Sequence, residues 1–308
     1  MLTMKQIVFS LLFCSCCFFL SCQHSDLPPN GKYKIVTTTG HIADMVRNIV
    51  GDNAEVVALM GPGVDPHLYK ASLRDLKELS SADIIFYSGL HLEGKMGDIF
   101  HKLSRTKHVV AVSDGIPGDQ LLLADAEKHV PDPHIWFDVR LWRYCLQKAL
   151  ASLIKYDPAH QEEFKQRAVA YDKKLEELHK DVLRDIHSIP AKQRVLVTAH
   201  DAFGYFGRAY GIEVIGLQGI STLSEYGLNE ITSLTKLLTS RHIPSIFMET
   251  SVSEKAIHSV IEGCRQKGHE VKIGGSLYSD ALGDPATPEG TYIGMFRHNV
   301  KLIKEGLQ

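Results

Sequence analysis

The segment from Pro158 to Ser188 most constrains the fold, because it contains no strand signal and no turn dipeptide. Its apolar residues recur at steps of three and four, which is typical of the buried face of one amphipathic helix. They are Phe164, Ala168, Tyr171, Leu175, Leu178, Val182 and Ile186. At 1.5 Å per residue such a helix would be roughly 45 Å long. A coiled coil is the alternative, but the stripe is too short to favour it, and we expect one helix that divides the chain into two halves.

Each half alternates strand and helix signals. In the first half we expect strands at 33–39, 55–60, 82–89 and 108–114, with helices near 42–51, 72–80 and 93–104. In the second half we expect strands at 194–199, 213–219, 243–250 and 269–275, helices between them, and a last helix from about Glu289. Runs of Val and Ile without polar alternation predict parallel strands buried on both faces. The predicted fold class is therefore α/β, with two doubly wound lobes joined by one long backbone helix.

The N-terminal residues are expected to serve export rather than the fold. The apolar run from Ile7 to Leu20 has the size of a secretory signal and is shorter than the ~20 residues that span a bilayer as a helix. We therefore expect residues 1–21 to be a signal peptide and the protein to act in the periplasm or at the cell surface. Cys22 follows Phe19-Leu20-Ser21, which resembles a relaxed bacterial lipobox, so a lipid on Cys22 would anchor the chain to a membrane. An uncleaved or ordinarily cleaved signal is the alternative, and residues 22–31 are expected to form a flexible tether.

The division at the long helix also sets the predicted domains. We expect residues 32–157 to form the first lobe, 158–189 the connecting helix and 190–308 the second lobe. With 34 Lys and Arg against 36 Asp and Glu, the chain has no basic stripe, so nucleic acid is not an expected partner. Cys145 and Cys264 lie in amphipathic helical patterns and are expected as separate buried thiols, although export would also permit a disulfide.

Three histidines and one aspartate follow predicted strands at the point where each strand ends. They are His67 after the second strand, His134 beyond the fourth, His200 directly after the first strand of the second half, and Asp280 after the last strand. Ligands of doubly wound sheets bind at the carboxyl ends of the strands, in the crevice between units. If the two halves face each other, these four side chains converge in that crevice.

His67 and His134 each end an Asp-Pro-His tripeptide. Proline fixes its own φ and moves the preceding residue out of the helical region, so each histidine lies on a stiff turn. A ligand held in this way loses little freedom when it binds a metal. Imidazole nitrogens with a carboxylate suit Zn²⁺, Mn²⁺ or Fe²⁺. The aspartates of the two tripeptides, Asp65 and Asp132, are expected to cap the turns rather than to bind metal.

Two further carboxylates lie at or just after the ends of predicted strands. Glu249, at the end of the predicted strand 243–250, is either a partner that fixes a histidine tautomer or a strand-end carboxylate without that role. Asp201, beside His200, is expected to cap a helix.

Five segments of the sequence are long and specific: "ALMGPGVDPHLY", "YSGLHLEGKMGDIF", "DPHIWFDV", "RVLVTAHDAFGYFGRAYGIEVIGLQGIST" and "GGSLYSDALGD". Through these segments the chain resembles the TroA-type solute-binding lipoproteins of metal-ion ABC transporters, bacterial solute-binding protein family 9. The resemblance covers nearly the whole mature chain and implies two β/α lobes on a rigid backbone helix. It also implies that His67, His134, His200 and Asp280 bind one transported metal ion. The implied partners are an ABC permease and its ATPase, and the implied protein is a monomer without enzymatic activity.

The resemblance leaves the metal open. Manganese-preferring relatives place a glutamate where His200 stands, whereas zinc-specific relatives tend to carry a long loop rich in His and acidic residues, which this chain lacks. Most nitrogen and oxygen sites bind Zn²⁺ more tightly than Mn²⁺ whatever the physiological metal, so the donor set does not decide. A metallohydrolase is the alternative from another class, but there is no His-Glu-x-x-His segment, and four protein ligands would nearly close the shell. An adhesin is a third hypothesis, but the sequence contains no repeat or exposed aromatic stretch that would support it.

Overall fold

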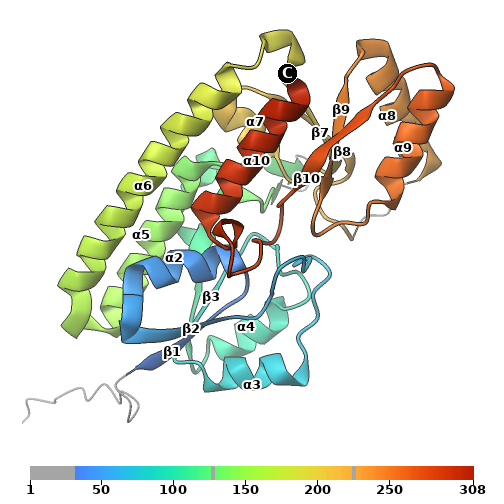
Figure 1. Ribbon diagram of the computed structural model, residues 1–308. Coiled ribbons are helices and arrows are strands. Elements are labelled where there is room, and N and C mark those ends of the chain that lie inside the picture. Colours follow the sequence, from blue (N-terminus) through green and yellow to red (C-terminus); the bar gives the residue numbers. More distant parts are fainter. Residues whose placement is uncertain (1–31, 126–128, 224–226) are drawn as a thin grey trace, which may run out of the picture. The chain divides into compact units, whose positions relative to one another are not determined.

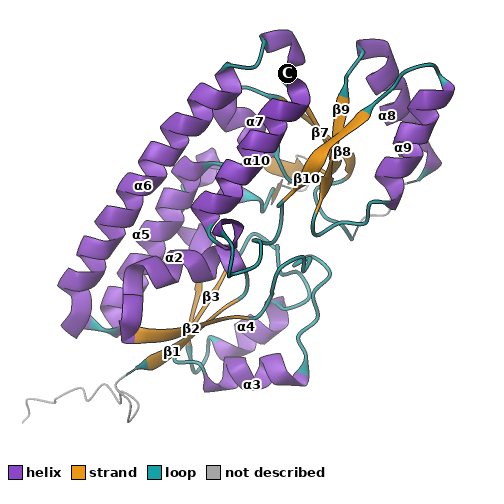
Figure 2. Ribbon diagram, in the orientation of Figure 1, coloured by secondary structure: helices purple, strands orange, loops and turns teal. Residues whose placement is uncertain are grey.

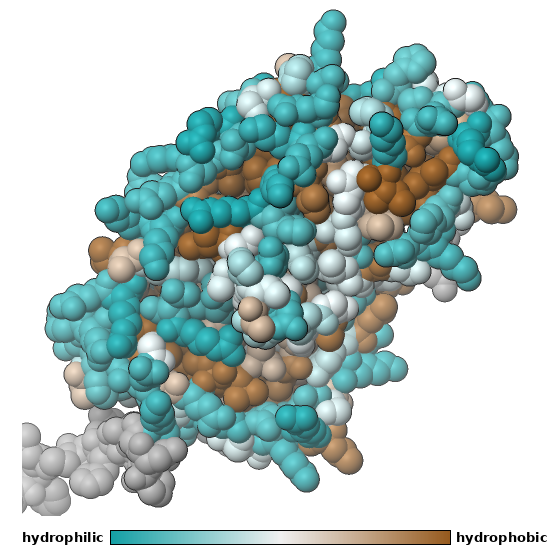
Figure 3. All heavy atoms as spheres, viewed as in Figure 1, coloured by the Kyte–Doolittle hydropathy of each residue, from teal (hydrophilic) through white to brown (hydrophobic). Residues whose placement is uncertain are grey.

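The structure is a computed structural model that describes residues 32–125, 129–223 and 227–308. The predicted signal peptide, Cys22 and the predicted tether therefore lie outside the described residues. Within the described ranges, no helix is both long enough and apolar enough to cross a bilayer. Figure 3 shows one face of the molecule, on which hydrophobic residues emerge as separate patches between hydrophilic side chains.

The first half builds a four-stranded parallel sheet in the order β2-β1-β3-β4 (Figures 1 and 2). Its strands are β1 (Tyr33–Thr37), β2 (Ala54–Ala58), β3 (Ile84–Tyr87) and β4 (His108–Ala111). Helices α2 (Gly40–Val50) and α5 (Val139–Tyr156) pack on one face, and α3 (Leu73–Ser81) and α4 (Gly97–Leu103) pack on the other. Neighbouring residues of β1 enter opposite clusters, Ile35 with α2 and α5 and Val36 with α3 and α4. The central strands β1 and β3 are thus buried on both faces, as predicted, whereas the edge strands β2 and β4 are only partly buried.

The second half repeats this layering with two parallel strand pairs. Strand β7 (Val195–His200) pairs with β8 (Glu213–Gln218), β9 (Ser245–Glu249) pairs with β10 (Lys272–Leu277), and β7 lies alongside β9. Helices α7 (Gly204–Tyr210) and α10 (Tyr292–Leu307) pack on one face, and α8 (Leu228–Arg241) and α9 (Lys255–Gln266) pack on the other. Within β7, Val195 and Val197 face α8 and α9, while Leu196 faces the opposite cluster.

The long predicted helix is α6 (Gln161–His187), which has 27 residues and is about 40 Å long. All seven residues of the predicted stripe are its buried residues. They pack against α2 and α5 of the first half and against α7 and α10 of the second. The predicted α/β fold with two lobes on a backbone helix is therefore confirmed.

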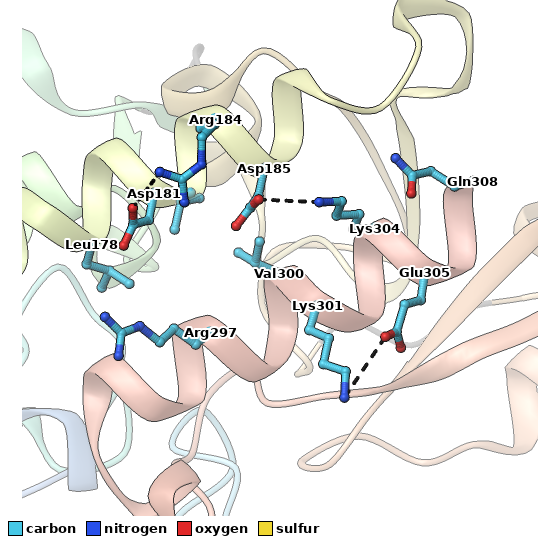
Figure 4. A pocket seen from close by; sticks show the side chains of 11 residues that line it. Leu178, Asp181, Arg184, Asp185, Arg297, Val300, Lys301, Lys304, Glu305 and Gln308 are labelled. Atoms are coloured by element: carbon cyan, nitrogen blue, oxygen red, sulfur yellow. Dashed lines mark hydrogen bonds and ion pairs between the residues drawn. The ribbon is translucent and has the colours of Figure 1, made fainter.

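A groove of about 400 Å³ runs between α6 and α10 (Figure 4). Lys304 of α10 crosses it to Asp185 of α6 at 3.4 Å, and Lys301 faces Glu305 along α10. Its acidic and basic side chains thus partly neutralise one another, and none of the four predicted ligands lines it. We interpret the groove as part of the seam that joins α10 to the backbone helix.

Replacing Leu175 with alanine is expected to lower the free energy of unfolding by about 2–5 kcal/mol, because the fully buried side chain would leave a cavity at the centre of α6. Urea unfolding followed by circular dichroism measures this loss. Val169→Ala on the same helix is the matched control, since that side chain is 70% exposed and its truncation should change little. Equal effects of the two substitutions would contradict the packing of α6.

Several local features differ from the sequence expectations. The predicted strand 108–114 ends at Ala111 and continues as a 3-10 helix, and the predicted strand 269–275 begins only at Lys272. Helix α4 begins at Gly97 rather than near residue 93, because residues 91–96 form turns, in which the Met96 N–H donates to the Glu93 carbonyl three residues earlier. Helix α10 begins at Tyr292, three residues after the expected start, because the Thr291 hydroxyl accepts the Gly294 N–H as an N-cap. A short antiparallel hairpin, β5 (Leu123–Asp125) and β6 (Val130–Pro131), was not predicted. It lies in the connection that leads to His134.

Both cysteines of the described chain are free and buried, as expected of separate thiols. Cys145 lies in the cluster around α5 and α6, whereas Cys264 lies in the cluster under α8 and α9.

Candidate metal site

The four predicted ligands come together in one buried cluster. His67, His134, His200 and Asp280 each offer a donor atom, and these atoms all lie within 4.8 Å of one another. Each residue is at most 2% exposed. His67, His200 and Asp280 lie at the carboxyl ends of β2, β7 and β10 or in the loops that follow them, whereas His134 follows the β5–β6 hairpin, well beyond the end of β4.

His67 lies in the loop between β2 and α3, on the first Asp-Pro-His turn. The Asp65 carboxylate accepts the backbone N–H of His67 at 2.8 Å, which is the predicted turn cap. Its other oxygen accepts the hydroxyl of Thr222 at 2.6 Å, so the turn is also bound to a loop of the second half. The His67 ring is thus held at its backbone, and its Nε2 points into the cluster.

His134 lies on the second Asp-Pro-His turn, which repeats the first with one addition. Asp132 Oδ1 accepts the backbone N–H of His134 at 2.9 Å and also lies 2.7 Å from its Nδ1. The Tyr205 hydroxyl of α7 donates to the Asp132 carbonyl at 2.9 Å. Because Nδ1 is engaged by a carboxylate, Nε2 is the nitrogen left for a metal.

His200 is the last residue of β7, and Glu249 is the last residue of the neighbouring β9. The His200 backbone N–H donates to Glu249 Oε1 at 2.8 Å, and Nδ1 lies 2.5 Å from Oε2 without the alignment of a hydrogen bond. Glu249 is therefore the partner of the histidine ring, one of its two predicted roles. The prediction that Asp201 caps a helix is wrong, since the N-cap of α7 is Phe203.

The distances between the donor atoms suit a metal ion. The Nε2 atoms of His67 and His134 are 3.2 Å apart. Asp280 lies 3.8 Å from His67 and 3.4 Å from His200 through Oδ2, and 3.5 Å from His134 through Oδ1. Four ligands at about 2.1 Å from a central ion have neighbours about 3.4 Å apart in a tetrahedron. Because both Asp280 oxygens face the histidines, the aspartate can supply one oxygen or two.

The charges of the cluster are set by burial and by its carboxylates. Burial lowers the pKa of His67 to about 4, so its imidazole is neutral at neutral pH. Burial acts in the same direction on His200, but Glu249 and Asp280 outweigh it and raise the pKa of His200 well above its usual value. The pKa of Asp280 is lowered, because its three histidine neighbours outweigh the opposing effect of burial.

Unsatisfied polar atoms indicate that the cluster is built for a ligand. Both carboxylate oxygens of Asp280 and the Nε2 of His200 are buried without a hydrogen-bond partner. A buried carboxylate without partners is costly unless a counter-ion compensates it. A divalent cation among these atoms would satisfy all of them at once, so the residues present fit a metal.

Sequence reasoning missed two aromatic residues beside the ligands. Trp136 is 2% exposed, and its ring lies edge-on to His134 at a centroid distance of 5.3 Å. His41, which follows β1, stacks on Trp136 at 5.1 Å, and neither of its ring nitrogens has a hydrogen-bond partner. Burial lowers the pKa of His41 to about 4. Trp136 falls inside the quoted segment "DPHIWFDV", but nothing local to that segment indicates its contacts.

Replacing Asp132 with alanine is expected to weaken metal binding by about 10- to 100-fold, because the Nδ1 partner and the turn cap of His134 are lost together. Isothermal titration of the metal-free protein measures the change. Asp119→Ala is the control, since this exposed aspartate lies in the same connection without contacting a ligand. The role of Asp132 would be refuted if both variants bound metal as the wild type does.

A family model described as "Zinc-uptake complex component A periplasmic" (ZnuA) matches residues 35–306. The chain is 50% identical over 277 residues to the manganese-binding lipoprotein MntA of Bacillus subtilis (strain 168), and the match covers 90% of each chain.

Solved structures of metal-binding proteins are also similar to this chain. The periplasmic zinc-binding protein TroA of Treponema pallidum superposes with a TM-score of 0.88 at 49% identity, covering 90% of this chain and 99% of that one. Fe(III)-bound YtgA of Chlamydia trachomatis superposes with a TM-score of 0.81 at 27% identity, covering 90% and 98%. The similar proteins are thus named for three different metals.

Proposed function

Because the chain belongs to the ZnuA family of zinc-uptake components, we propose that it captures a divalent transition metal outside the cytoplasmic membrane and delivers it to an ABC permease. The observation that carries the proposal is the cluster of four buried donors with unsatisfied Asp280 oxygens. In this proposal His67, His134 and His200 bind the ion through Nε2, and Asp280 binds it through its carboxylate. The ion is cargo, and the site needs affinity rather than reactivity.

The cargo is proposed to be Zn²⁺ or Mn²⁺, with Fe²⁺ as a third candidate. Three imidazoles favour Zn²⁺, whereas a carboxylate that can offer two oxygens also suits the larger coordination number of Mn²⁺. Metal binding would displace protons from the cluster, and the unsatisfied oxygens of Asp280 and the Nε2 of His200 would become metal ligands. Since the four donors are buried, capture and release require part of the surrounding structure to move.

The family is one of solute-binding transport proteins, and we propose that this chain likewise catalyses no reaction. We propose the same arrangement along the chain that the sequence predicts: a signal peptide at 1–21, a lipid on Cys22, and a tether at 22–31. The first lobe would then be 32–157, the connecting helix 158–189 and the second lobe 190–308. The protein would act as a monomer held on a membrane, with the permease and its ATPase as partners.

Titration of chelator-stripped protein with Zn²⁺, Mn²⁺ and anaerobic Fe²⁺ tests the proposal. One ion should bind per chain and raise the melting temperature, since a ligand at 100 times its Kd stabilises the folded state by about 2.7 kcal/mol. His134→Ala should abolish most of the shift, whereas His258→Ala, at an exposed histidine of α9, should not. A wild-type protein that bound none of the three ions would overturn the proposal.

A further inference from the structure

Asp280 differs from the other three members of the cluster in how it is held. A neighbouring carboxylate contacts the backbone or ring of each histidine: Asp65 for His67, Asp132 for His134 and Glu249 for His200. Neither oxygen of Asp280 accepts a hydrogen bond. No hydrogen bond therefore fixes the direction of the Asp280 carboxylate, so the contacts of the residue before it help to set that direction.

That residue, Ser279, is fully buried and is bound from both halves of the chain. Its carbonyl oxygen accepts the indole N–H of Trp136 at 3.0 Å. Its hydroxyl lies 2.8 Å from the hydroxyl of Ser251, two residues after Glu249. These contacts link the Asp280 loop to the segments that carry His134 and that hold His200.

Trp136 is itself fixed on three sides. Its ring is stacked on His41 and meets the edge of His134, and its carbonyl oxygen accepts the Tyr292 hydroxyl at 2.6 Å. The indole N–H thus projects from a rigid part of the first half toward a loop of the second half. This hydrogen bond links the segment of His134, which lies two residues before Trp136, to Asp280, which directly follows the acceptor Ser279.

We propose that Trp136 is a positioning residue for Asp280, and that its hydrogen bond to the Ser279 carbonyl slows release of the bound metal. This inference rests on the proposed function, because it assigns a role within the same metal site. Without the indole N–H, the Asp280 backbone would keep only the Ser251 contact at Ser279. The carboxylate would then leave the ion more often, while the three histidines would keep their own supports.

The substitution Trp136→Phe tests the proposal, because phenylalanine keeps an aromatic ring against His41 and removes the N–H donor. We expect Zn²⁺ affinity to fall by about 10- to 100-fold, chiefly through faster release to an excess of a colorimetric chelator. Trp142→Phe is the matched control. Trp142 is also buried, but its indole N–H approaches the Tyr171 hydroxyl and makes no hydrogen bond with the Asp280 loop.

A double-mutant cycle separates positioning from general loosening of the core. In an Asp280→Ala background there is no carboxylate to position, so Trp136→Phe should cause little further loss of Zn²⁺ affinity. A loss that is the same in both backgrounds would show that Trp136 acts without Asp280 and would overturn the proposal. Equal rates of Zn²⁺ release from the Trp136→Phe and Trp142→Phe variants would also overturn the proposal. Failure of the proposed function is a different outcome: the wild-type protein would then bind no metal in the titration with Zn²⁺, Mn²⁺ and Fe²⁺ described above.

Discussion

Replacing Asp280 with asparagine is expected to reduce the affinity for Zn²⁺ or Mn²⁺ by more than about 100-fold. This loss exceeds the 10- to 100-fold that is typical when a residue that only hydrogen-bonds a metal ligand is replaced. Asp280 supplies the only negative charge among the four donors, and its pKa is lowered by the histidines, so it is ionised at neutral pH. Asparagine keeps the shape of the side chain but removes that charge. Competition against a chelating dye of known affinity measures the loss.

Asp284→Asn is the matched control, because it makes the same chemical change four residues away on an exposed part of the same loop. The asparagine oxygen can still accept the Ala286 N–H that Asp284 accepts at 2.8 Å. We expect this variant to bind metal as the wild type does. If Asp280→Asn matched Asp284→Asn in affinity, the carboxylate would not be a ligand.

Metal binding at pH 7 is expected to release about one proton, and affinity should fall about tenfold for each unit by which pH is lowered from 7. The proton comes from His200, whose pKa is raised above its usual value and which is therefore protonated in the metal-free site. His67 is already neutral, because its pKa is about 4, and it competes for protons only below that pH. Calorimetry in buffers of different ionisation enthalpy counts the released protons.

Glu249→Gln provides the control for this assignment. It removes one of the two carboxylates that raise the pKa of His200, so fewer protons should be released at pH 7. Glu254→Gln, at an exposed residue beside α9, should leave the count unchanged. Proton release that was the same in both variants would show that His200 is not the group that titrates.

The fold was predictable where local pattern and tertiary packing agree. The apolar stripe of α6 continues without interruption through seven buried residues, so its period alone identified the helix and its buried face. Helix α3 begins within one residue of its expected start, at a capping box formed by Ser72 and Asp75. The start of α4 was not predictable, because the turns over residues 91–96 belong to the folded loop and no capping residue in the sequence marks Gly97 as the start.

The positions of the four predicted ligands followed from strand ends and stiff turns, but their supports did not. Glu249 lies 49 residues from His200 in the sequence, and Trp136 lies 143 residues from Ser279. Such pairs are brought together only by the packing of whole strands and helices. Local sequence patterns therefore left two alternative roles for Glu249, and they gave no indication of the role of Trp136.

The preference for one metal is not encoded in overall similarity. Proteins of about 50% identity to this chain are named for manganese and for zinc. We propose that differences in metal choice depend on details of the site, such as whether the Asp280 carboxylate offers one oxygen or two. If Asp280 binds the ion as proposed, the hydrogen bond from Trp136 to Ser279 would bear on that choice, because it would help set the direction from which the carboxylate approaches.

The measurement that tests the metal site most directly is a crystal structure of the protein loaded with Zn²⁺ or Mn²⁺, with anomalous diffraction recorded at the absorption edge of the metal. The account predicts one buried anomalous peak, bounded by the Nε2 atoms of His67, His134 and His200 and by the carboxylate of Asp280. Ligand distances should be about 2.0–2.2 Å for zinc. A peak bound by other residues, or a loaded crystal with no peak inside this cluster, would contradict it.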